Sequence, residues 1–361
     1  MSSPSNFDSR PTGPQESELE VSVVAPCYNE EGNIAELERR VAAVCRPAVG
    51  DSYEIVLVND GSKDGTWAAI QEIAAKGGNI VGVNLSRNHG HQLALSAGLS
   101  VTRGARILVI DADLQDPPEL LPKMMALMDS GADVVYGQRL KRPGDSGLRR
   151  AASSIFYRLL RHLSDVDIPL DAGDFRLMSR RVLDQLLAMP EKHRFIRGMI
   201  SWVGYKQVPI PYERSTRTEG ETSYSARRLI SFAIDGISGF SIRPLRLVTY
   251  VGLATSSLSA LYAAYIFFVW LLRDVPVAGW PSLMAAILLL GGVQMIFLGL
   301  IGEYVGRIFQ EVKGRPLFVI SEIITSENAT AGNQAGTVQP PLPTVAGPEL
   351  SPGAATPSAK R

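Results

Sequence analysis

The chain of 361 residues is poor in cysteine and histidine and has no excess of charge of either sign. Its two cysteines, Cys27 and Cys45, lack the spacing of a metal motif, and we interpret them as a reduced cytosolic pair. The four histidines are too few for a histidine-rich metal site. Lysine plus arginine and aspartate plus glutamate both number 36, so the basic surplus typical of nucleic-acid-binding proteins is missing. We therefore expect no nucleic-acid partner.

The two ends of the chain lack the patterns of targeting signals and of folded segments. Residues 1–18 are polar and rich in serine and proline, without the basic start and apolar run of a signal peptide. We expect them to form a disordered lead and the catalytic part to stay on the cytoplasmic side. Residues 326–361 are rich in proline, threonine, alanine and glycine, a composition that predicts a disordered tail.

Between the ends, short apolar runs alternate with segments of helical periodicity. The runs predict strands at 21–25, 54–58, 80–85, 106–110 and 133–137, and the segments between them predict helices at 30–45, 66–76, 90–102 and 119–129. This alternation predicts an α/β fold with a mostly parallel, Rossmann-like sheet. Polar clusters follow three of the strands, at 28–30, 59–60 and 111–113. Because ligands bind at the carboxyl ends of such strands, we expect the clusters to meet in one crevice.

Two long uncharged stretches follow near the C-terminus. Residues 247–272 and 282–302 carry no charged side chain and are long enough to cross a bilayer, so they predict two transmembrane helices in a hairpin. Residues 226–246 fit an amphipathic interfacial helix on a membrane surface, although a helix packed on the core would show the same apolar stripe. Basic residues lie at both outer ends of the hairpin, which predicts that both termini are cytoplasmic.

An acidic cluster follows the fourth predicted strand. Asp111 and Asp113 lie two residues apart where the strand becomes a loop, and Gln115 adds an amide oxygen. Oxygen ligands of this kind suit Mg²⁺ or Mn²⁺, which would neutralise a pyrophosphate leaving group. A solvated loop or a helix cap would show the same bare D-x-D pattern. The apolar strand before it and the two prolines after it make the pattern more specific for a metal site.

In four motifs the chain resembles the family 2 glycosyltransferases with the GT-A fold. Within them it is most similar to the dolichol- and undecaprenyl-phosphate sugar transferases, and especially to bacterial polyprenyl-phosphate glucosyltransferases. The motifs are residues 24–30, 58–66, 111–119 and 171–177, and the two-span hairpin is part of the resemblance. It implies inverting transfer of a hexose, with UDP-glucose as the first choice of donor, to a polyprenyl-phosphate lipid. GDP-mannose or another UDP-sugar, a processive polysaccharide synthase and a non-catalytic membrane scaffold remain as alternatives.

The resemblance also implies a role for each matched residue. The residues that would bind the nucleotide-sugar are Pro26, Tyr28, Glu30, Asp60 and Asp111, and the metal ligands would be Asp113 and Gln115. Asp174 would stand beside the acceptor phosphate or the sugar and would be catalytic together with Arg217. A phosphate monoester has a second pKa of about 6 and is already nucleophilic near neutral pH, so Asp174 could act as a base or as an orienting group.

Arginines and histidines complete the set of candidate site residues. Arginine suits phosphate because of its planar donor fork, and the arginines expected at the phosphate and acceptor are Arg139, Arg142, Arg176 and Arg214. For Arg139 and Arg142, a solvated charged loop is the alternative. His89 and His91 fit a packed or hydrogen-bonded pair better than a metal pair, because the sequence offers no third ligand nearby.

These inferences predict a multi-pass protein of the plasma membrane. A GT-A catalytic domain would occupy residues 19–225, and a cytoplasmic C-terminal segment at 303–325 would follow the hairpin. The resemblance further implies a homo-oligomer, up to a tetramer, with residues 316–320 as a strand exchanged between subunits. The expected partners are therefore a nucleotide-sugar, a polyprenyl phosphate, the membrane and further copies of the chain.

Overall fold

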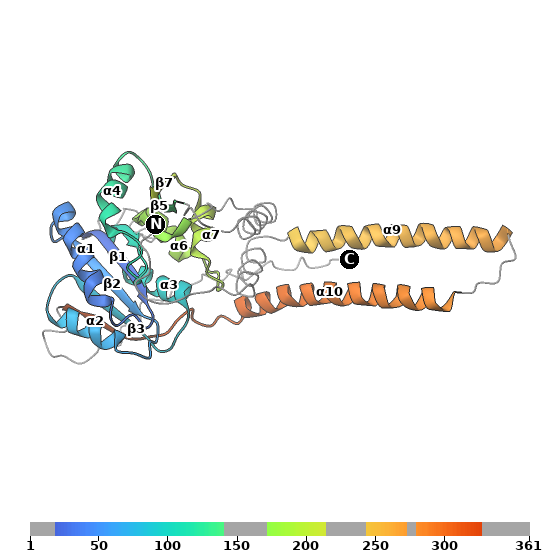
Figure 1. The fold of residues 1–361 in the computed structure, drawn as a ribbon, viewed down its shortest axis with the longest axis horizontal. Coiled ribbons are helices and arrows are strands. Elements are labelled where there is room, and N and C mark those ends of the chain that lie inside the picture. Colours follow the sequence, from blue (N-terminus) through green and yellow to red (C-terminus); the bar gives the residue numbers. More distant parts are fainter. Residues whose placement is uncertain (1–18, 141–171, 214–242, 273–278, 327–361) are drawn as a thin grey trace, which may run out of the picture.

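The computed structural model describes residues 19–140, 172–213, 243–272 and 279–326 (Figure 1). The expected disordered ends, most of the interfacial helix at 226–246 and three candidate arginines (Arg142, Arg214 and Arg217) lie outside the described residues. Their predicted structures and roles stay predictions.

The described residues form one sheet of eight strands in the order β7-β5-β6-β4-β1-β2-β3-β8. The strands are β1 (Leu19–Cys27), β2 (Tyr53–Asn59), β3 (Ile80–Leu85), β4 (Gly104–Val109), β5 (Val134–Arg139), β6 (Ala172–Ser179), β7 (Gln207–Tyr212) and β8 (Ile320–Thr325). The central strands β4, β1, β2 and β3 run parallel, and β7 runs parallel to β5. Strand β6 is antiparallel to both of its neighbours, and β8 is antiparallel to β3. The prediction of a mostly parallel sheet is confirmed.

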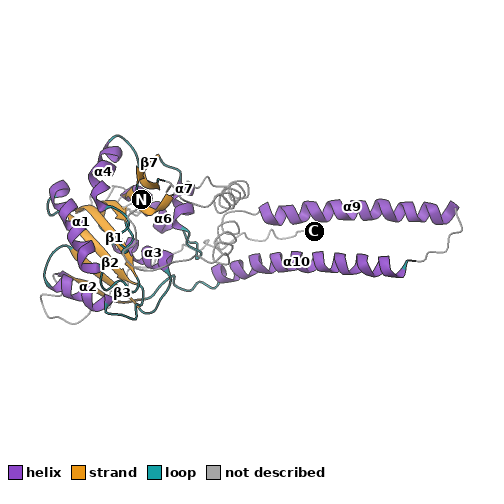
Figure 2. Cartoon of the chain, viewed as in Figure 1, coloured by secondary structure: helices purple, strands orange, loops and turns teal. Residues whose placement is uncertain are grey.

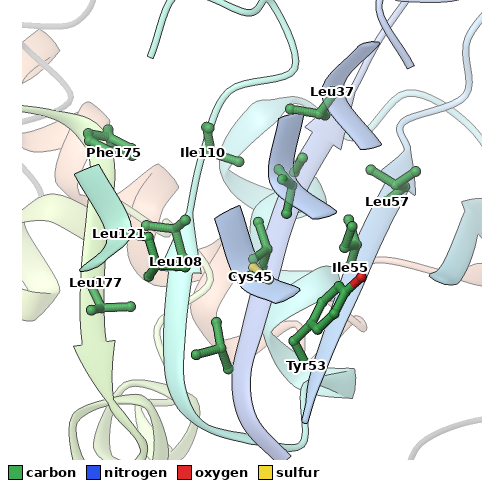
Figure 3. Close-up of a cluster of buried hydrophobic side chains, with 14 of the residues drawn as sticks. Leu37, Cys45, Tyr53, Ile55, Leu57, Leu108, Ile110, Leu121, Phe175 and Leu177 are labelled. Carbon is green, nitrogen blue, oxygen red and sulfur yellow. The ribbon is translucent and has the colours of Figure 1, made fainter. Parts of the chain in front are cut away.

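Helices cover both faces of this sheet (Figures 1 and 2). One face packs against α1 (Ile34–Val49), α2 (Thr66–Ala75) and α4 (Leu121–Asp129), and the other against α3 (His91–Val101), α6 (Arg180–Ala188) and α7 (Ile196–Val203). A short 3₁₀ turn, η1 (Pro118–Leu120), precedes α4. Every residue of β2 is buried, as expected for a strand that is covered on both sides. Figure 3 shows the core beneath α1, where Leu37, Ile55 and Leu108 are nearly inaccessible to solvent.

The five predicted strands and four predicted helices are all present, with ends that differ by a few residues. The structure adds β6, β7, α6 and α7, which the sequence pattern did not predict. It also adds β8 to the sheet, although this strand lies far beyond residue 225. The fold of the α/β part therefore uses chain from both sides of the hairpin.

Two long helices extend away from the α/β part: α9 (Arg243–Leu272) and α10 (Trp280–Val312) (Figure 1). They pack against each other as a hairpin. Among the described residues, Leu290–Val312 is long and apolar enough to cross a membrane. The predicted first span, 247–272, lies within α9, and that it crosses a membrane stays a prediction.

The chain returns from α10 to the sheet through β8. This strand begins at Ile320 and pairs with β3 of the same chain, so of the segment 316–320 only Ile320 belongs to a strand. Exchange of this segment between subunits, and the oligomer itself, stay predictions.

Candidate active site

The loops that follow β1 and β2 meet at the carboxyl edge of the sheet, as the parallel order predicts. The Asp60 amide donates a hydrogen bond to the carbonyl of Cys27 at 2.9 Å. Asn29 has a positive φ of 56° and links the loops in both directions: its amide donates to Ser62 Oγ at 3.0 Å, and its Oδ1 accepts from the Lys63 amide at 2.9 Å. The left-handed backbone at Asn29 is a conformation that asparagine tolerates better than most residues.

Of the residues predicted to bind the nucleotide-sugar, Tyr28, Glu30 and Asp60 lie on these two loops, whereas Pro26 lies in β1 and Asp111 follows β4. Tyr28 is 43% exposed, whereas Pro26, two residues before it, is buried. The Glu30 amide donates to Thr66 Oγ1 at 2.9 Å, and its carboxylate accepts from Asn33 Nδ2 at 2.5 Å. Glu30 is therefore hydrogen-bonded to the starts of α1 and α2. Among Pro26, Tyr28 and Glu30, Tyr28 is the most exposed.

Asp60 is almost fully buried and holds the loop that precedes α3. Its Oδ1 accepts from the His89 amide at 2.7 Å, and its Oδ2 accepts from the Gly90 amide at 3.0 Å. Gly61 follows with a φ of 61°, and a side chain there would collide with the backbone of Arg87 and Asn88. The close contact between these two loops fixes where α3 begins.

The acidic loop after β4 gathers negative charge in a small space. The Gln115 amide donates to Asp113 Oδ1 at 3.1 Å, and Asp116 Oδ1 accepts from the Tyr212 hydroxyl at 2.6 Å. Burial raises the pKa of Asp111 to about 6, with His91 opposing the shift and the carboxylates of Asp116, Asp174 and Asp113 adding to it. A divalent cation would relieve this accumulation of charge, so the donor set of carboxylate and amide oxygens fits a hard metal ion.

Asp174, on β6, lies at the centre of a second polar cluster. Arg197, in the first turn of α7, contacts it with both arms of its guanidinium, Nε to Oδ1 at 2.7 Å and Nη2 to Oδ2 at 3.0 Å. From α3, His91 Nε2 lies 3.1 Å from Asp174 Oδ2, and Gln92 Nε2 donates to the same oxygen at 3.4 Å. We call these four residues the Asp174 cluster. It joins β6 to helices from two different parts of the chain.

The two polar clusters are in contact. His91 Nε2 is 3.7 Å from Asp111 Oδ1, and one ligand atom from each of His91, Asp111 and Asp174 lies within 4.8 Å of the others. Chemically, this trio could also hold a metal ion. Because the guanidinium of Arg197 already engages both oxygens of Asp174, the loop of Asp113 and Gln115 suits a cation better.

Charge in the Asp174 cluster is fixed by its surroundings. Burial would raise the pKa of Asp174, but His91, Arg197 and Arg176 outweigh it and hold that pKa well below its ordinary range. Burial would lower the pKa of His91, but the hydrogen bond to Asp174 and the charges of Asp111 and Asp174 raise it overall. Since an ionised Asp174 can only accept, His91 Nε2 carries the proton in this contact.

Two arginines predicted to bind phosphate lie near this cluster in different settings. Arg139 lies against Gly173, where an added Cβ would be 2.7 Å from its Nη2, and its Nε donates to the Tyr212 hydroxyl at 3.3 Å. Arg176 is buried and donates to the carbonyls of Gly173 and Asp174 at 2.8 and 3.2 Å. Burial lowers the pKa of Arg176 to about 10. Arg139 is thus the more accessible arginine, and Arg176 supports the backbone of β6.

Sequence reasoning missed Arg197 and Gln92 as site residues. Of the two histidines, the hydrogen-bonded interpretation is confirmed for His91. The further ligands that the sequence did not reveal are Asp111 and Asp174, which lie beside it. Arg197 lies in an amphipathic helix whose buried residues include Ile196, Met199 and Ile200, and an arginine at the start of such a helix is usually a surface residue. Only the fold brings it to Asp174.

The fold is of the α/β class, and the predicted site lies at the carboxyl ends of its parallel strands, where enzymes of this class bind their substrates. Residues 22–187 match the glycosyl transferase family 2 model, and residues 243–308 match the GtrB C-terminal hairpin model. The uncharacterized glycosyltransferase YkcC of Bacillus subtilis strain 168 is 41% identical over 86% of this chain and 96% of its own length. The uncharacterized glycosyltransferase sll0501 of Synechocystis is 43% identical over 84% of this chain and 96% of its own.

A further relative has a named activity. The SfII prophage-derived bactoprenol glucosyl transferase of Shigella flexneri is 40% identical over 84% of this chain and 98% of its own length. Together these matches show that the chain belongs to glycosyl transferase family 2 and is a glycosyltransferase.

Proposed function

We propose that this protein transfers glucose from UDP-glucose to undecaprenyl phosphate at the cytoplasmic face of the membrane, with inversion at the anomeric carbon. The observation that carries the proposal is the 40% identity to a bactoprenol glucosyl transferase over 98% of that protein's length. The match includes the hairpin as well as the α/β part, so it concerns the lipid side of the reaction too.

The donor would bind along the ends of β1, β2 and β4. The partly exposed ring of Tyr28 would offer a stacking surface for the base. Asp60 joins the end of β1 to the loop before α3 and would support this side of the nucleotide site. Asp113 and Gln115 would hold Mg²⁺ or Mn²⁺, which when bound neutralises charge on the departing nucleoside diphosphate. Asp111, with its raised pKa, would stay beside these ligands as an anion once a cation compensates it.

On the acceptor side, we infer that Asp174 orients rather than abstracts a proton. Both of its oxygens are engaged by Arg197, and its pKa is held low, so it is a poor base. The acceptor phosphate is largely a dianion near neutral pH and needs no base. The aligned Arg197, together with Arg139, would hold this phosphate for in-line attack on the sugar. Arg217, Arg142 and Arg214 belong to the same proposal as further phosphate contacts.

We further propose that α9 and α10 both span the membrane. They are 30 and 33 residues long, which corresponds to about 45 and 50 Å of helix, against about 30 Å of hydrocarbon in a bilayer. Large apolar side chains are exposed along both, for example Leu261 at 70% and Ile296 at 71%. Such exposure suits contact with lipid. A pair of membrane-spanning helices would hold the active site next to an acceptor that cannot leave the bilayer.

The test is transfer of radiolabelled sugar from a panel of UDP- and GDP-sugars to undecaprenyl phosphate, with purified full-length protein in detergent. We expect lipid label from UDP-glucose, lost with EDTA and lost with Asp113→Ala. Label from another donor would replace the sugar but keep the reaction class. If folded protein labels no lipid from any donor, polyprenyl phosphate is not the acceptor.

A further inference from the structure

In the last turn of α10, the carboxylate of Glu311 binds the α/β part. Glu311 Oε1 accepts hydrogen bonds from the Lys192 amide at 2.8 Å and from the His193 amide at 3.3 Å, and His193 Nδ1 lies 3.4 Å from the same oxygen. Glu311 Oε2 accepts from the Lys192 amide at 3.0 Å. The Lys192 ammonium donates to the carbonyl of Arg315 at 2.8 Å, just beyond the helix. We call these contacts the α10 clamp.

The α10 clamp binds the loop at Lys192 and His193, which leads to Arg197 in the Asp174 cluster. Arg194 follows directly and is fixed to the end of α6 and the residue after it, through the carbonyls of Leu186 and Met189 at 2.8 and 2.7 Å. The Ile196 amide then donates to Gln92 Oε1 at 3.0 Å. Arg197 comes next and binds Asp174. Only a few residues separate Lys192 and His193, which bind Glu311, from Arg197, whose guanidinium we expect at the acceptor phosphate. Arg194 and Ile196 in between, and Arg197 itself, are each held by hydrogen bonds.

Strand β8 attaches the same end of α10 at a second place. Its pairing with β3 holds Ile320–Thr325, and the Ser86 amide donates to the carbonyl of Val319 at 2.9 Å. Between Lys313 and Val319, however, the chain contains no helix or strand. A link of this kind limits how far α10 can move from the sheet, but it does not fix the helix direction. Among the described residues, the α10 clamp adds a constraint on that direction.

We propose that Glu311 is a positioning residue that sets the acceptor side of the active site in register with the membrane helix. The proposal rests on the lipid acceptor proposed above. The phosphate of a membrane lipid arrives at a height fixed by the bilayer, so the arginines that receive it must be held at a matching height. Glu311 does this by holding the start of α7 against the end of α10. It touches no substrate itself.

The experiment compares two acceptors with the full-length protein. One is undecaprenyl phosphate in vesicles of phosphatidylethanolamine and phosphatidylglycerol, and the other is a short, water-soluble prenyl phosphate that reaches the site without the bilayer. We expect Glu311→Ala to reduce transfer to the vesicle-bound lipid about tenfold, the size expected for loss of a charged hydrogen bond. Transfer to the soluble acceptor and the KM for UDP-glucose should stay within about twofold, well inside that tenfold scale.

Matched variants separate positioning from general damage. Glu303→Ala removes the same charge from the same helix, where Glu303 pairs with Arg307 at 3.2 Å, and should leave both transfer rates unchanged. Glu311→Gln keeps one acceptor oxygen and should give an intermediate loss. An equal loss on both acceptors, or no loss on either, would overturn the proposal. A native protein that transfers to neither acceptor would count against the proposed function instead.

A second measurement does not depend on any substrate. Amide hydrogen exchange of residues 190–197 should accelerate in Glu311→Ala and stay unchanged in Glu303→Ala, because only the first variant frees the Lys192 and His193 amides. Unchanged exchange in both variants would show that the α10 clamp does not hold this loop. The proposal would then fail whichever reaction the protein catalyses.

Discussion

At the residue scale, Asp174 collects side chains from α3 and α7 onto one buried strand. We predict that Asp174→Asn lowers kcat about 100-fold, because the forked contact that aligns Arg197 is lost, while the KM for the donor changes little. Arg197→Lys, which keeps the charge but not the fork, should lower kcat less, by about tenfold. Steady-state kinetics with each substrate varied in turn make the comparison.

The pH profile distinguishes an orienting group from a base. The pKa of Asp174 is held well below its ordinary range, so this carboxylate is ionised at every pH where the protein works. An orienting Asp174 therefore adds no acidic limb near neutral pH to the native kcat profile. A limb that disappears in Asp174→Asn would contradict the orienting role.

Asp111 links stability to function. Its pKa in the folded chain is about 6 and its ordinary value is 3.8. The free energy of unfolding of the metal-free protein therefore falls as the pH rises between these two values, because the unfolded chain ionises Asp111 more easily. This loss is complete at neutral pH and absent below the ordinary pKa. We predict that Asp111→Asn stabilises the metal-free protein at pH 7 by at most about 3 kcal/mol, and that this difference is nearly gone at about pH 3. Thermal melts at both pH values measure this.

The metal reverses that order. Mn²⁺ with UDP should raise the melting temperature of the native protein, because binding to the folded state alone stabilises it, and should do so much less in Asp111→Asn. If Asp111→Asn is no more stable than the native protein when metal is absent, ionised Asp111 does not destabilise the fold as its raised pKa implies.

At the element scale, α3 must lie close to the sheet for His91 and Gln92 to reach Asp174. Gly98 allows this approach: an added Cβ would lie 2.5 Å from Val24 Cγ1 and 2.8 Å from Val58 Cγ2. Alanine normally favours a helix over glycine by about 1 kcal/mol, but overpacking costs about 1–3 kcal/mol. We predict that Gly98→Ala destabilises the protein by about 1 kcal/mol and lowers transfer activity.

Gly32 is the control for this substitution, since no atom lies within 4 Å of a Cβ added there. Gly32→Ala should change neither the melting temperature nor the activity. A stabilised Gly98→Ala variant would mean that α3 can move away from β1 and β2 without cost, and that its position is not set by this contact.

Two of the strands that the sequence did not reveal, β6 and β7, contain residues that contradict a simple strand pattern. Strand β6 buries Asp174 and Arg176, which read as a polar loop until their partners are known. Strand β7 contains Pro209 and Pro211, which are tolerated because it lies at the edge of the sheet. Both strands depend on distant neighbours for their stability, and local patterns do not record such neighbours.

The candidate site divides in the same way. Tyr28, Asp60, Asp111 and Asp113 follow predictable parallel strands, so their position at one edge of the sheet could be inferred from the order of the elements. The meeting of His91 and Arg197 at Asp174 could not, because it depends on the antiparallel insertion of β6 and on contacts between elements far apart in the chain.

At the scale of the whole molecule, the α/β part lies at one end and the hairpin extends from it (Figure 1). If both helices span the membrane, the chain on the outer sides of α9 and α10 must share one compartment, and their connecting link must lie in the other. Basic residues near Arg243 and Lys313 predict that the shared compartment is the cytoplasm. This arrangement would keep the donor site among cytoplasmic nucleotide-sugars.

Cysteine labelling tests this topology with little background. Burial raises the pKa of Cys27 and raises that of Cys45 to about 12, so neither thiol reacts readily with a maleimide. We predict that Ser321→Cys, at an exposed position of β8, is labelled by a membrane-impermeant maleimide in inverted vesicles and not in intact cells. Val277→Cys, in the link between the helices, should show the opposite pattern. Labelling of both from the cytoplasmic side would mean that the hairpin enters the membrane without crossing it. The site would then still meet a lipid phosphate, but the two-span anchor would be wrong.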